Sequence, residues 1–215
     1  KLKKYNKVIK PKIKNTGYLK LDNIYNLMKK KIIYRKDVIL IAPGFSNYFN
    51  DINLKNHLKS IIEETILKLK MKVIFRPHPL DLNLKGDFEF VKKIQDTFSY
   101  NSRFRLDNST SYLNSFRQAK LMITDITSSA YTFAFSSNKP VIFFSPNDQK
   151  IKNNKLFKNN YFKDRKKIGV VIKNVNHLKK AINFLDNNKV NFKKKIAKTR
   201  ANRIEHFKNS KQIMF

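Results

Sequence analysis

Continuous runs of apolar residues recur along the chain, and the segments between them carry apolar residues at three- and four-residue spacing. The runs predict strands at 38–42, 72–76, 103–106, 121–124, 140–144 and 168–172. The spacing predicts helices at 22–31, 51–70, 88–98, 111–118, 128–136, 177–185 and 192–207. Apolar strands that alternate with helices are typical of a parallel sheet covered on both faces. We therefore expect an α/β fold with a doubly wound, mainly parallel, Rossmann-like sheet.

Three segments differ in composition from this alternating region. Residues 1–15 alternate Lys with apolar residues, which predicts an extended leading segment or linker. Residues 145–167 are rich in Asn and Lys, which predicts a long surface loop. The last helix is polar enough to lie on the outside. We accordingly divide the chain into a linker at 1–15, one α/β domain at 16–186 and a basic C-terminal helix within 187–215.

The net charge is strongly positive but unevenly distributed. The 47 Lys and Arg residues outnumber 15 Asp and Glu, which gives +32. Residues 1–40 carry +11 (13 basic, 2 acidic), residues 41–150 carry +5 (15 and 10), and residues 151–215 carry +16 (19 and 3). Only 8 of the basic residues are Arg, whose guanidinium forms bidentate hydrogen bonds with bases and phosphates. We therefore do not expect nucleic acid as a partner. The Lys-rich flanks suit an anionic membrane surface or a polyanionic product as well as they suit DNA.

Several classes of protein are excluded by what the sequence lacks. Without Cys, the chain has no disulfides and no thiolate metal site, and no metal-ligand spacing such as HExxH occurs. There is no run of about 18 apolar residues and no apolar leader stretch. Neither a Gly-rich nucleotide fingerprint nor a Gly-x-Ser-x-Gly elbow is present. We expect no metal and no cofactor. The chain starts at Lys1 rather than Met, so we expect it to be a piece of a longer protein.

The most distinctive motif is Arg76-Pro77-His78-Pro79, at the end of a predicted strand. In doubly wound sheets, ligands bind outside the carboxyl ends of the strands. Two prolines fix the backbone on either side of one imidazole. A rigid His beside an Arg suits an anionic ligand such as a phosphate, although a stiff turn with a backbone-bonded His would have the same sequence.

Two further strand ends carry candidate binding residues. One is Ala42-Pro43-Gly44, and the other is Asp125 followed by the hydroxyls of Thr127, Ser128 and Ser129 at a helix start. A helix N-terminus offers free N–H groups and a positive dipole end, although Ser, Thr and Asp also serve as ordinary N-caps. If the ends lie together in the sheet, they could converge on one pyrophosphate.

The other titratable candidates carry weaker signals. His57 lies in an amphipathic helix, His177 at a predicted helix start and His206 in a basic C-terminal helix. Glu63-Glu64 is expected to be a solvated helix face. Neither Glu is expected to be a general base, and the three His are not expected to carry function.

Taken in order, these motifs resemble the CDP-glycerol glycerophosphotransferase family of teichoic-acid primases and polymerases. The resemblance starts at Thr16-Gly17-Tyr18 with Asp22, and continues through the strand that ends at Ala42-Pro43-Gly44 and the Arg-Pro-His-Pro motif. It extends to Ile123-Thr124-Asp125 with the hydroxyl cluster, and to Lys139-Pro140 with the strand that follows. Together the motifs cover residues 14–185. The family has a two-domain GT-B architecture, so the resemblance implies that this chain is the C-terminal, nucleotide-binding half.

The resemblance also implies a role for each motif. His78 would contact the donor pyrophosphate as the catalytic residue of this half, with Arg76 in support. Thr127, Ser128 and Ser129 would form a second phosphate contact. Asp125 would hold the loop or bind a donor hydroxyl, and Pro43 and Gly44 would line the donor site. The activity implied is transfer of glycerol phosphate from CDP-glycerol, or another nucleotide-activated donor, to an anionic polymer or lipid-linked acceptor.

Two departures from the family pattern leave alternatives open. Thr132 stands where related transferases carry an acidic residue, and the family's general base is expected in an N-terminal half that this chain lacks. One alternative is a GT-B glycosyltransferase that uses a sugar nucleotide for capsule or lipopolysaccharide. The others are a basic nucleic-acid-binding α/β module and a degenerate domain that only binds. The expected location is cytoplasmic, peripheral at the inner face of the cell membrane.

Overall fold

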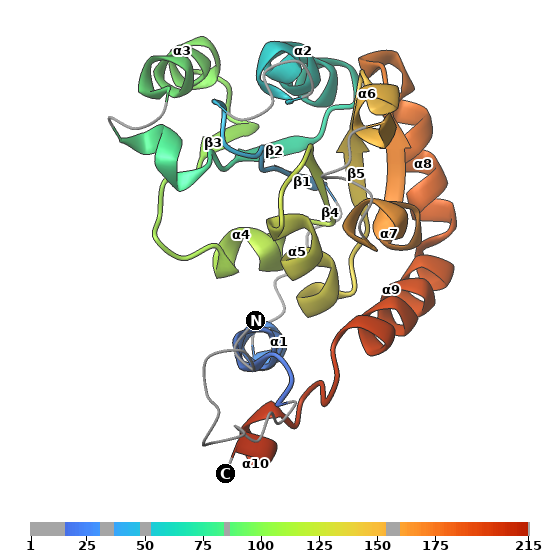
Figure 1. Ribbon diagram of the computed structural model, residues 1–215. Coiled ribbons are helices and arrows are strands. Elements are labelled where there is room, and N and C mark those ends of the chain that lie inside the picture. The colour runs from blue at the N-terminus through green and yellow to red at the C-terminus, as the bar shows by residue number, and fades with distance from the viewer. Residues whose placement is uncertain (1–15, 31–36, 48–52, 84–86, 154–159, 215) are drawn as a thin grey trace.

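A computed structural model describes residues 16–30, 37–47, 53–83, 87–153 and 160–214 (Figure 1). Its centre is a six-stranded, wholly parallel sheet in the order β3-β2-β1-β4-β5-β6. The strands are β1 (Val38–Ile41), β2 (Lys72–Phe75), β3 (Phe104–Leu106), β4 (Leu121–Thr124), β5 (Val141–Phe144) and β6 (Gly169–Ile172). This order reverses direction between β1 and β4, as in a Rossmann fold. The predicted doubly wound α/β fold is therefore confirmed.

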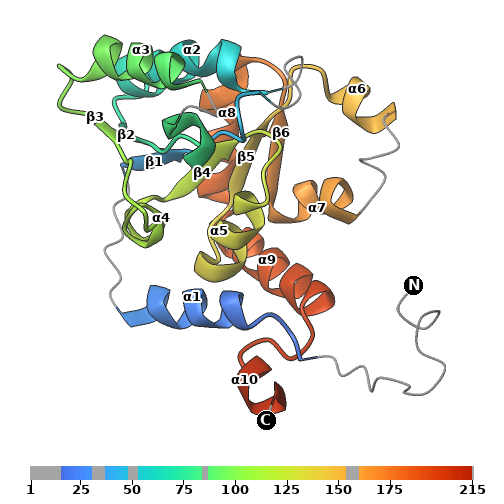
Figure 2. The same cartoon turned by 60° about the vertical axis from the view of Figure 1, so that its left-hand side comes forward.

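Helices cover both faces of the sheet, as the continuous apolar strands predict (Figures 1 and 2). Ile39 and Ile41 of β1 point into one core layer, while Val38 and Leu40 point into the other. The first layer packs α2 (Leu58–Glu63), α3 (Phe88–Phe98) and α8 (Leu178–Asn187) against the sheet. The second packs α4 (Leu113–Gln118), α5 (Ser129–Ser137) and α9 (Lys189–Arg203). Burial on both sides explains why these strands are almost free of polar residues.

The expectation of a long loop at 145–167 is wrong for the residues described there. The chain forms α6 (Asp148–Asn153) and α7 (Asn160–Ile168) instead. Buried Arg165 donates from Nη2 to Asp148 at 2.7 Å, and its guanidinium lies over the rings of Phe143 and Phe162. The helices are thus held by a buried ion pair between distant residues, which leaves no apolar period in the local sequence.

The helix predicted at 51–70 is less regular than its periodicity implies. Residues 51 and 52 lie outside the described residues, and η2 (Lys55–His57) forms a 3₁₀ turn before α2. After α2, the wide π-helical turn η3 (Glu64–Lys68) follows. The Thr65 hydroxyl donates to the carbonyl of Ile61 at 2.7 Å within this region. Side-chain bonding to a preceding carbonyl competes with the regular helical pattern.

The last predicted helix, 192–207, is shifted. α9 begins at Lys189 and ends at Arg203, and a turn with positive φ at His206 and Lys208 leads to α10 (Ser210–Met214). Phe192, Ile196 and Arg200 are buried, so one face of α9 packs against the domain while the other is exposed. The predicted linker at 1–15 lies outside the described residues.

The N-terminal and C-terminal parts of the described chain contact one another. α1 (Leu19–Lys30) packs on α4 and α5 on the side away from the sheet, and α10 lies next to it (Figure 2). The buried carboxylate of Asp22 accepts hydrogen bonds from the backbone N–H groups of Lys208 (2.8 Å) and Ser210 (3.1 Å). Gly17 has φ of +84°, and a Cβ there would lie 2.5 Å from the Ser210 hydroxyl. The Thr-Gly-Tyr segment and Asp22 therefore bind the C-terminal segment through close packing and hydrogen bonds.

None of the helices in the described residues is long and apolar enough to cross a membrane.

We expect Asp22→Ala to lower the free energy of unfolding by about 1–3 kcal/mol, because two buried N–H groups lose their acceptor. Urea denaturation measures the loss, and amide exchange at Lys208 and Ser210 should accelerate. Asp96→Ala, at an exposed position of α3, is the control and should change stability by less than about 0.5 kcal/mol. Equal losses in both variants would contradict a specific link between the chain ends.

Candidate functional site

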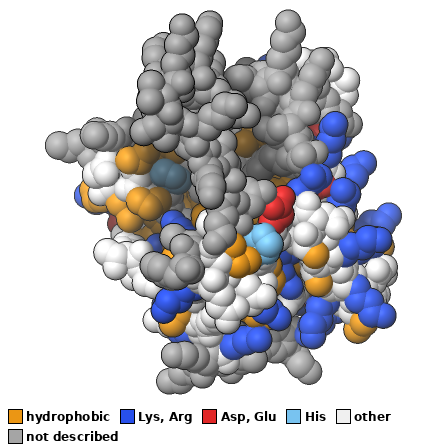
Figure 3. Space-filling model, turned by 60° about the horizontal axis from the view of Figure 1, so that its bottom comes forward, with side chains coloured by type: hydrophobic (Ala, Val, Ile, Leu, Met, Phe, Trp, Pro, Cys, Tyr) orange, Lys and Arg blue, Asp and Glu red, His pale blue; other side chains and the backbone are white. Residues whose placement is uncertain are grey.

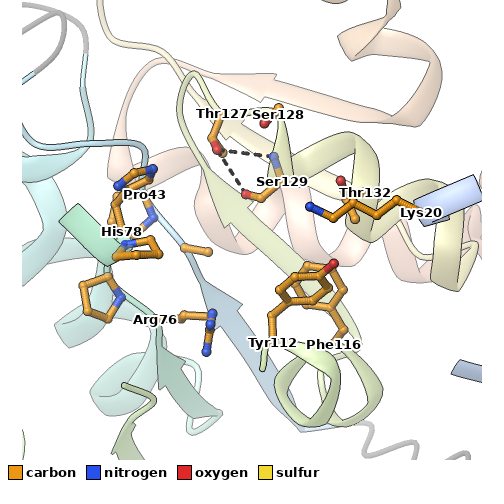
Figure 4. Close-up of a pocket in the computed structure, with 13 residues that line it drawn as sticks. Lys20, Pro43, Arg76, His78, Tyr112, Phe116, Thr127, Ser128, Ser129 and Thr132 are labelled. Atoms are coloured by element: carbon orange, nitrogen blue, oxygen red, sulfur yellow. Dashed lines mark hydrogen bonds between the residues drawn. The ribbon is translucent and has the colours of Figure 1, made fainter. Parts of the chain in front are cut away.

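Three predicted loops meet at one edge of the sheet because β2, β1 and β4 are neighbours and all run in the same direction. Their carboxyl ends surround a cavity of about 230 Å³ at the point where the strand order reverses. Of the residues singled out in the sequence, the cavity is lined by Pro43, Arg76, His78, Thr127, Ser128 and Ser129 (Figure 4). Asp125 and Gly44 lie behind the lining rather than in it.

Asp125 connects the loops from beneath the cavity. Its side chain is buried, and its carboxylate accepts from the backbone N–H groups of Gly44 and Leu54, each at 2.7 Å. Burial raises the pKa of this carboxyl, and the two N–H groups oppose that rise. A Cβ at Gly44 would lie 2.8 Å from the carbonyl of Ile126, so only glycine permits this approach. Of the two predicted roles for Asp125, the geometry favours holding the loop.

A second buried carboxylate, Asp81, attaches the β1 loop to the Arg-Pro-His-Pro loop. It lies in η4 (Pro79–Leu82) and accepts from the Ser46 backbone N–H at 3.2 Å and from the Ser46 hydroxyl at 2.5 Å. Sequence analysis did not identify this residue. A single Asp in a Pro-Leu-Asp-Leu turn resembles any surface turn, and its partner is 35 positions away.

The imidazole of His78 has a defined orientation and charge state. The Leu80 backbone N–H donates to Nδ1 at 3.2 Å, so the neutral ring carries its proton on Nε2. The Phe45 ring lies beside it, with centroids 5.6 Å apart. Partial burial lowers the pKa of His78 below 6.5, although the charges of Asp81 and Asp125 oppose this shift. His78 is therefore a neutral hydrogen-bond donor at the cavity wall.

The guanidinium of Arg76 is anchored at the end of β3. Nη1 donates to Asp107 at 2.8 Å, and Nη2 donates to the Ser109 carbonyl at 2.9 Å. Burial acts to raise the pKa of Asp107, but hydrogen bonds from Ser109, Ser115 and Arg76 hold it below its usual value. Arg76 thus contributes a positive group in a fixed position, and Asp107 already compensates part of its charge.

The opposite wall is the N-terminus of α5. Thr127 Oγ1 and Ser129 Oγ lie 3.1 Å apart, and the Ser129 N–H donates to Thr127 Oγ1 at 3.3 Å (Figure 4). The N-cap residue Ser128 makes no capping bond with its side chain and is exposed. This wall therefore presents hydroxyls and a positive helix end to a ligand. Thr132, one turn further on, also lines the cavity.

Three lining residues lay outside the sequence predictions: Lys20 of α1, and Tyr112 and Phe116 at α4. Their place depends on the packing of α1 against α4 and α5, which no local pattern signals. Burial raises the pKa of Tyr112, so its hydroxyl stays protonated. None of the described lining residues is acidic, and among the described residues no group of three or more His, Cys, Asp or Glu could hold a metal ion.

The weaker candidates of the sequence lie away from the cavity. The His57 ring packs on Phe144, with centroids 4.9 Å apart, and His177 and His206 are exposed. Glu63 and Glu64 form i,i+4 ion pairs with Lys59 and Lys68. The Glu63 side chain is solvated as expected, whereas that of Glu64 is only 12% exposed, so the expectation is wrong for Glu64.

Fold and site together define a Rossmann-like domain with a cavity at its topological switch point, lined by hydroxyls and positively charged side chains. The chain belongs to the CDP-glycerol:poly(glycerophosphate) glycerophosphotransferase family, whose sequence model matches residues 2–214. The family suggested by the sequence motifs is therefore confirmed.

Known relatives are considerably longer than this chain. It is 28% identical over 191 residues to the minor teichoic acid biosynthesis protein GgaB of Bacillus subtilis (strain 168), covering 80% of this chain and 19% of that protein. The solved structure of the wall teichoic acid polymerase TagF matches with a TM-score of 0.57 at 21% identity, over 89% of this chain and 45% of that one. A TagF variant soaked with CDPG matches with the same TM-score at 19% identity, over 89% and 44%. At these identities the two structures support the fold alone.

We expect Asp125→Asn to destabilise the protein by about 2–4 kcal/mol, since an amide offers one acceptor oxygen where two buried N–H groups need partners. Chemical denaturation measures the loss, and amide exchange should accelerate at Gly44 and Leu54. Glu89→Gln, the same chemical change at an exposed site of α3, should be nearly neutral. If Asp125→Asn were equally neutral, the carboxylate would not be what holds the loops.

Proposed function

We propose that this chain is the donor-nucleotide-binding half of a transferase that moves glycerol phosphate from CDP-glycerol to a teichoic-acid-like or capsule polymer. One observation carries the proposal: the Nε2–H of His78 and the hydroxyl-bearing N-terminus of α5 form opposing walls of one cavity at the switch point. Family membership supports the reaction class. The family description names CDP-glycerol, which supports the kind of donor, and CDPG is the compound soaked into the TagF variant.

Each wall would bind part of the donor pyrophosphate. His78 would donate its Nε2–H to a phosphate oxygen, and the α5 N-terminus with Thr127, Ser128 and Ser129 would hold the other phosphate. Arg76, fixed by Asp107, would add positive charge and orient the loop. Such donors stabilise charge that develops on the phosphoryl oxygens without having to reorganise during the reaction.

The transfer itself would be a displacement at phosphorus. An acceptor hydroxyl oxygen would bond to the β-phosphorus of the donor while the bond from that phosphorus to the bridging oxygen breaks. CMP would leave with the electron pair. Phosphoryl transfer depends mainly on positioning and charge stabilisation. The described lining residues include no carboxylate, and His78 is a donor, so the acceptor proton would go to a base that is not among them.

The basic surface suits a peripheral location at the inner face of the cell membrane. The exposed side of α9 carries Lys194, Lys195 and Lys198 and no acidic residue. Lys and Arg gather on that side of the molecule in Figure 3. Anionic lipids attract such segments with about 1 kcal/mol per Lys or Arg.

Calorimetric titration of CDP-glycerol into the protein tests the donor site. We expect His78→Ala to weaken binding about ten- to a hundredfold, the loss of one hydrogen bond to a charged group. His78→Asn, which keeps an acceptor near Nδ1, should bind as weakly as the alanine variant. His78→Gln, which places an N–H near the Nε2 position, should recover part of the affinity. His177→Ala, at an exposed imidazole, should bind as the parent does.

The competing hypotheses predict other outcomes of this titration. Selective binding of UDP-sugars or CMP-sugars over CDP-glycerol would indicate a glycosyltransferase. Binding of duplex DNA with a steep salt dependence, indifferent to His78→Ala, would indicate a nucleic-acid module. Failure of CDP-glycerol to bind, or equal binding by His78→Ala, would overturn the proposal.

The pH dependence of binding tests the charge state of His78. Because the pKa of His78 lies below 6.5, the ring stays neutral as the pH rises. The affinity for CDP-glycerol should therefore stay level between about pH 7 and pH 9, where the phosphates do not titrate either. If the imidazolium were the ligand, the affinity would instead fall steadily as the pH rises through that range.

A further inference from the structure

A second cavity lies at the other end of α5 from the donor site. This basal cavity has a volume of about 300 Å³ and is enclosed by α1, the end of α4, the residues that follow α5 and the start of α9. α5 has nine residues and is thus about 13 Å long. The donor cavity is at its N-terminus and the basal cavity at its C-terminus, so one helix connects the two.

The lining of the basal cavity is strongly basic. Five of its residues carry positive side chains, and none of the described lining residues is acidic: Lys29, Arg117, Lys139, Lys189 and Lys193. Arg117 donates from Nη2 to the Leu27 carbonyl at 2.6 Å, while its buried Nε–H lacks a hydrogen-bond partner. Tyr25 and Met28 add an apolar wall between these charges.

Two helix ends that would repel an anion are covered by cations here. Helix C-termini carry partial negative charge on their free carbonyls. Lys139 Nζ donates to the carbonyls of Phe116, Arg117 and Ala119 at 2.6–2.9 Å, at the end of α4. At the end of α5, Arg200 Nη1 donates to the Phe135 carbonyl at 2.5 Å and to the Asn138 side-chain oxygen at 2.8 Å. The negative ends are thus neutralised, and the exposed lysines at the rim set the sign of the potential.

The lowered pKa of Lys139 agrees with an excess of positive charge in the basal cavity. Burial and, to a smaller extent, the charge of Lys189 together lower the pKa of Lys139 to about 8. An acidic neighbour would raise this pKa, and the described lining offers none.

From this geometry we infer that the basal cavity is a second anion site, which holds a phosphodiester segment of the growing polymer while the donor cavity holds the nucleotide. A polymer of single-charge phosphodiesters joined by short carbon units matches a basic rim with an apolar wall. A recess of this size accommodates a chain segment, whereas a flat lipid surface would need an exposed, protruding face. The inference rests on the proposed function, since that function supplies the polymer.

Binding of a glycerol-phosphate oligomer to the full chain tests the inference. We expect Lys29→Gln combined with Lys193→Gln to weaken oligomer binding about tenfold or more and to reduce its salt dependence, because two phosphate contacts are lost. Both lysines are exposed, so the fold should be retained. Lys29→Arg combined with Lys193→Arg should preserve binding. Lys92→Gln combined with Lys93→Gln on α3 makes the same charge change far from the cavity and should have little effect.

The same binding experiments distinguish the basal cavity from the donor cavity. The basal variant should bind CDP-glycerol as the parent does, and His78→Ala should bind the oligomer as the parent does. If CDP-glycerol fails to bind to the parent, the proposed function fails, whereas a lysine-dependent oligomer contact would still identify the anion site.

Two results would overturn the inference. The first is an equal loss of oligomer binding in the α3 control pair. The second is unchanged oligomer binding in the basal variant. If that variant at the same time loses binding to vesicles of anionic phospholipid, the lysines would be assigned to a lipid headgroup instead.

Discussion

The buried carboxylate of Asp125 is the interaction on which the site geometry depends. It lies at the end of β4 and accepts hydrogen bonds from Gly44 and Leu54, which begin and end the long connection from β1 to α2. Asp81 holds the same connection at Ser46 and joins it to the loop of His78. A buried charge is costly unless it is fully hydrogen-bonded, so the N–H groups and the carboxylates constrain one another. The positions of His78 and of the α5 N-terminus follow from these bonds.

α5 connects the donor cavity to the opposite side of the domain. Its N-terminus forms one wall of the donor cavity, and its C-terminus is held by Arg200 from α9. The same guanidinium lies over the rings of Tyr25 and Phe207, with its central carbon 4.3 Å from the centroid of Phe207. α1 and the C-terminal segment are thus packed around one cation. Because α1 also contributes Lys20 to the donor cavity, the C-terminal segment that Asp22 holds supports the site as well.

The sheet and its loops were predictable because their causes are local. Strands buried on both faces must be apolar throughout, and parallel strands place their carboxyl ends at one edge, so the loops of His78 and Ser128 had to be close. α6 and α7 escaped prediction because the Asp148–Arg165 pair that holds them leaves no apolar period. Lys20 and Tyr112 escaped because their positions depend on how α1 packs. The role of Asp81 depends on a partner 35 residues away. Local sequence patterns thus predicted the loop residues of the site, whereas the lining residues that depend on long-range packing were not predictable.

The chemistry of the donor cavity limits what its described lining can do in the proposed reaction. Among the described lining residues, the polar groups are donors, hydroxyls and cations, without a carboxylate. Such a set can bind and polarise a pyrophosphate but cannot take a proton from an acceptor hydroxyl. Burial lowers the pKa of His78, and the bond from the Leu80 N–H to Nδ1 fixes the tautomer of the neutral ring, so that Nε2–H is the ring group that can meet a ligand. In the proposed reaction, donor binding and proton removal would therefore be carried out by different groups.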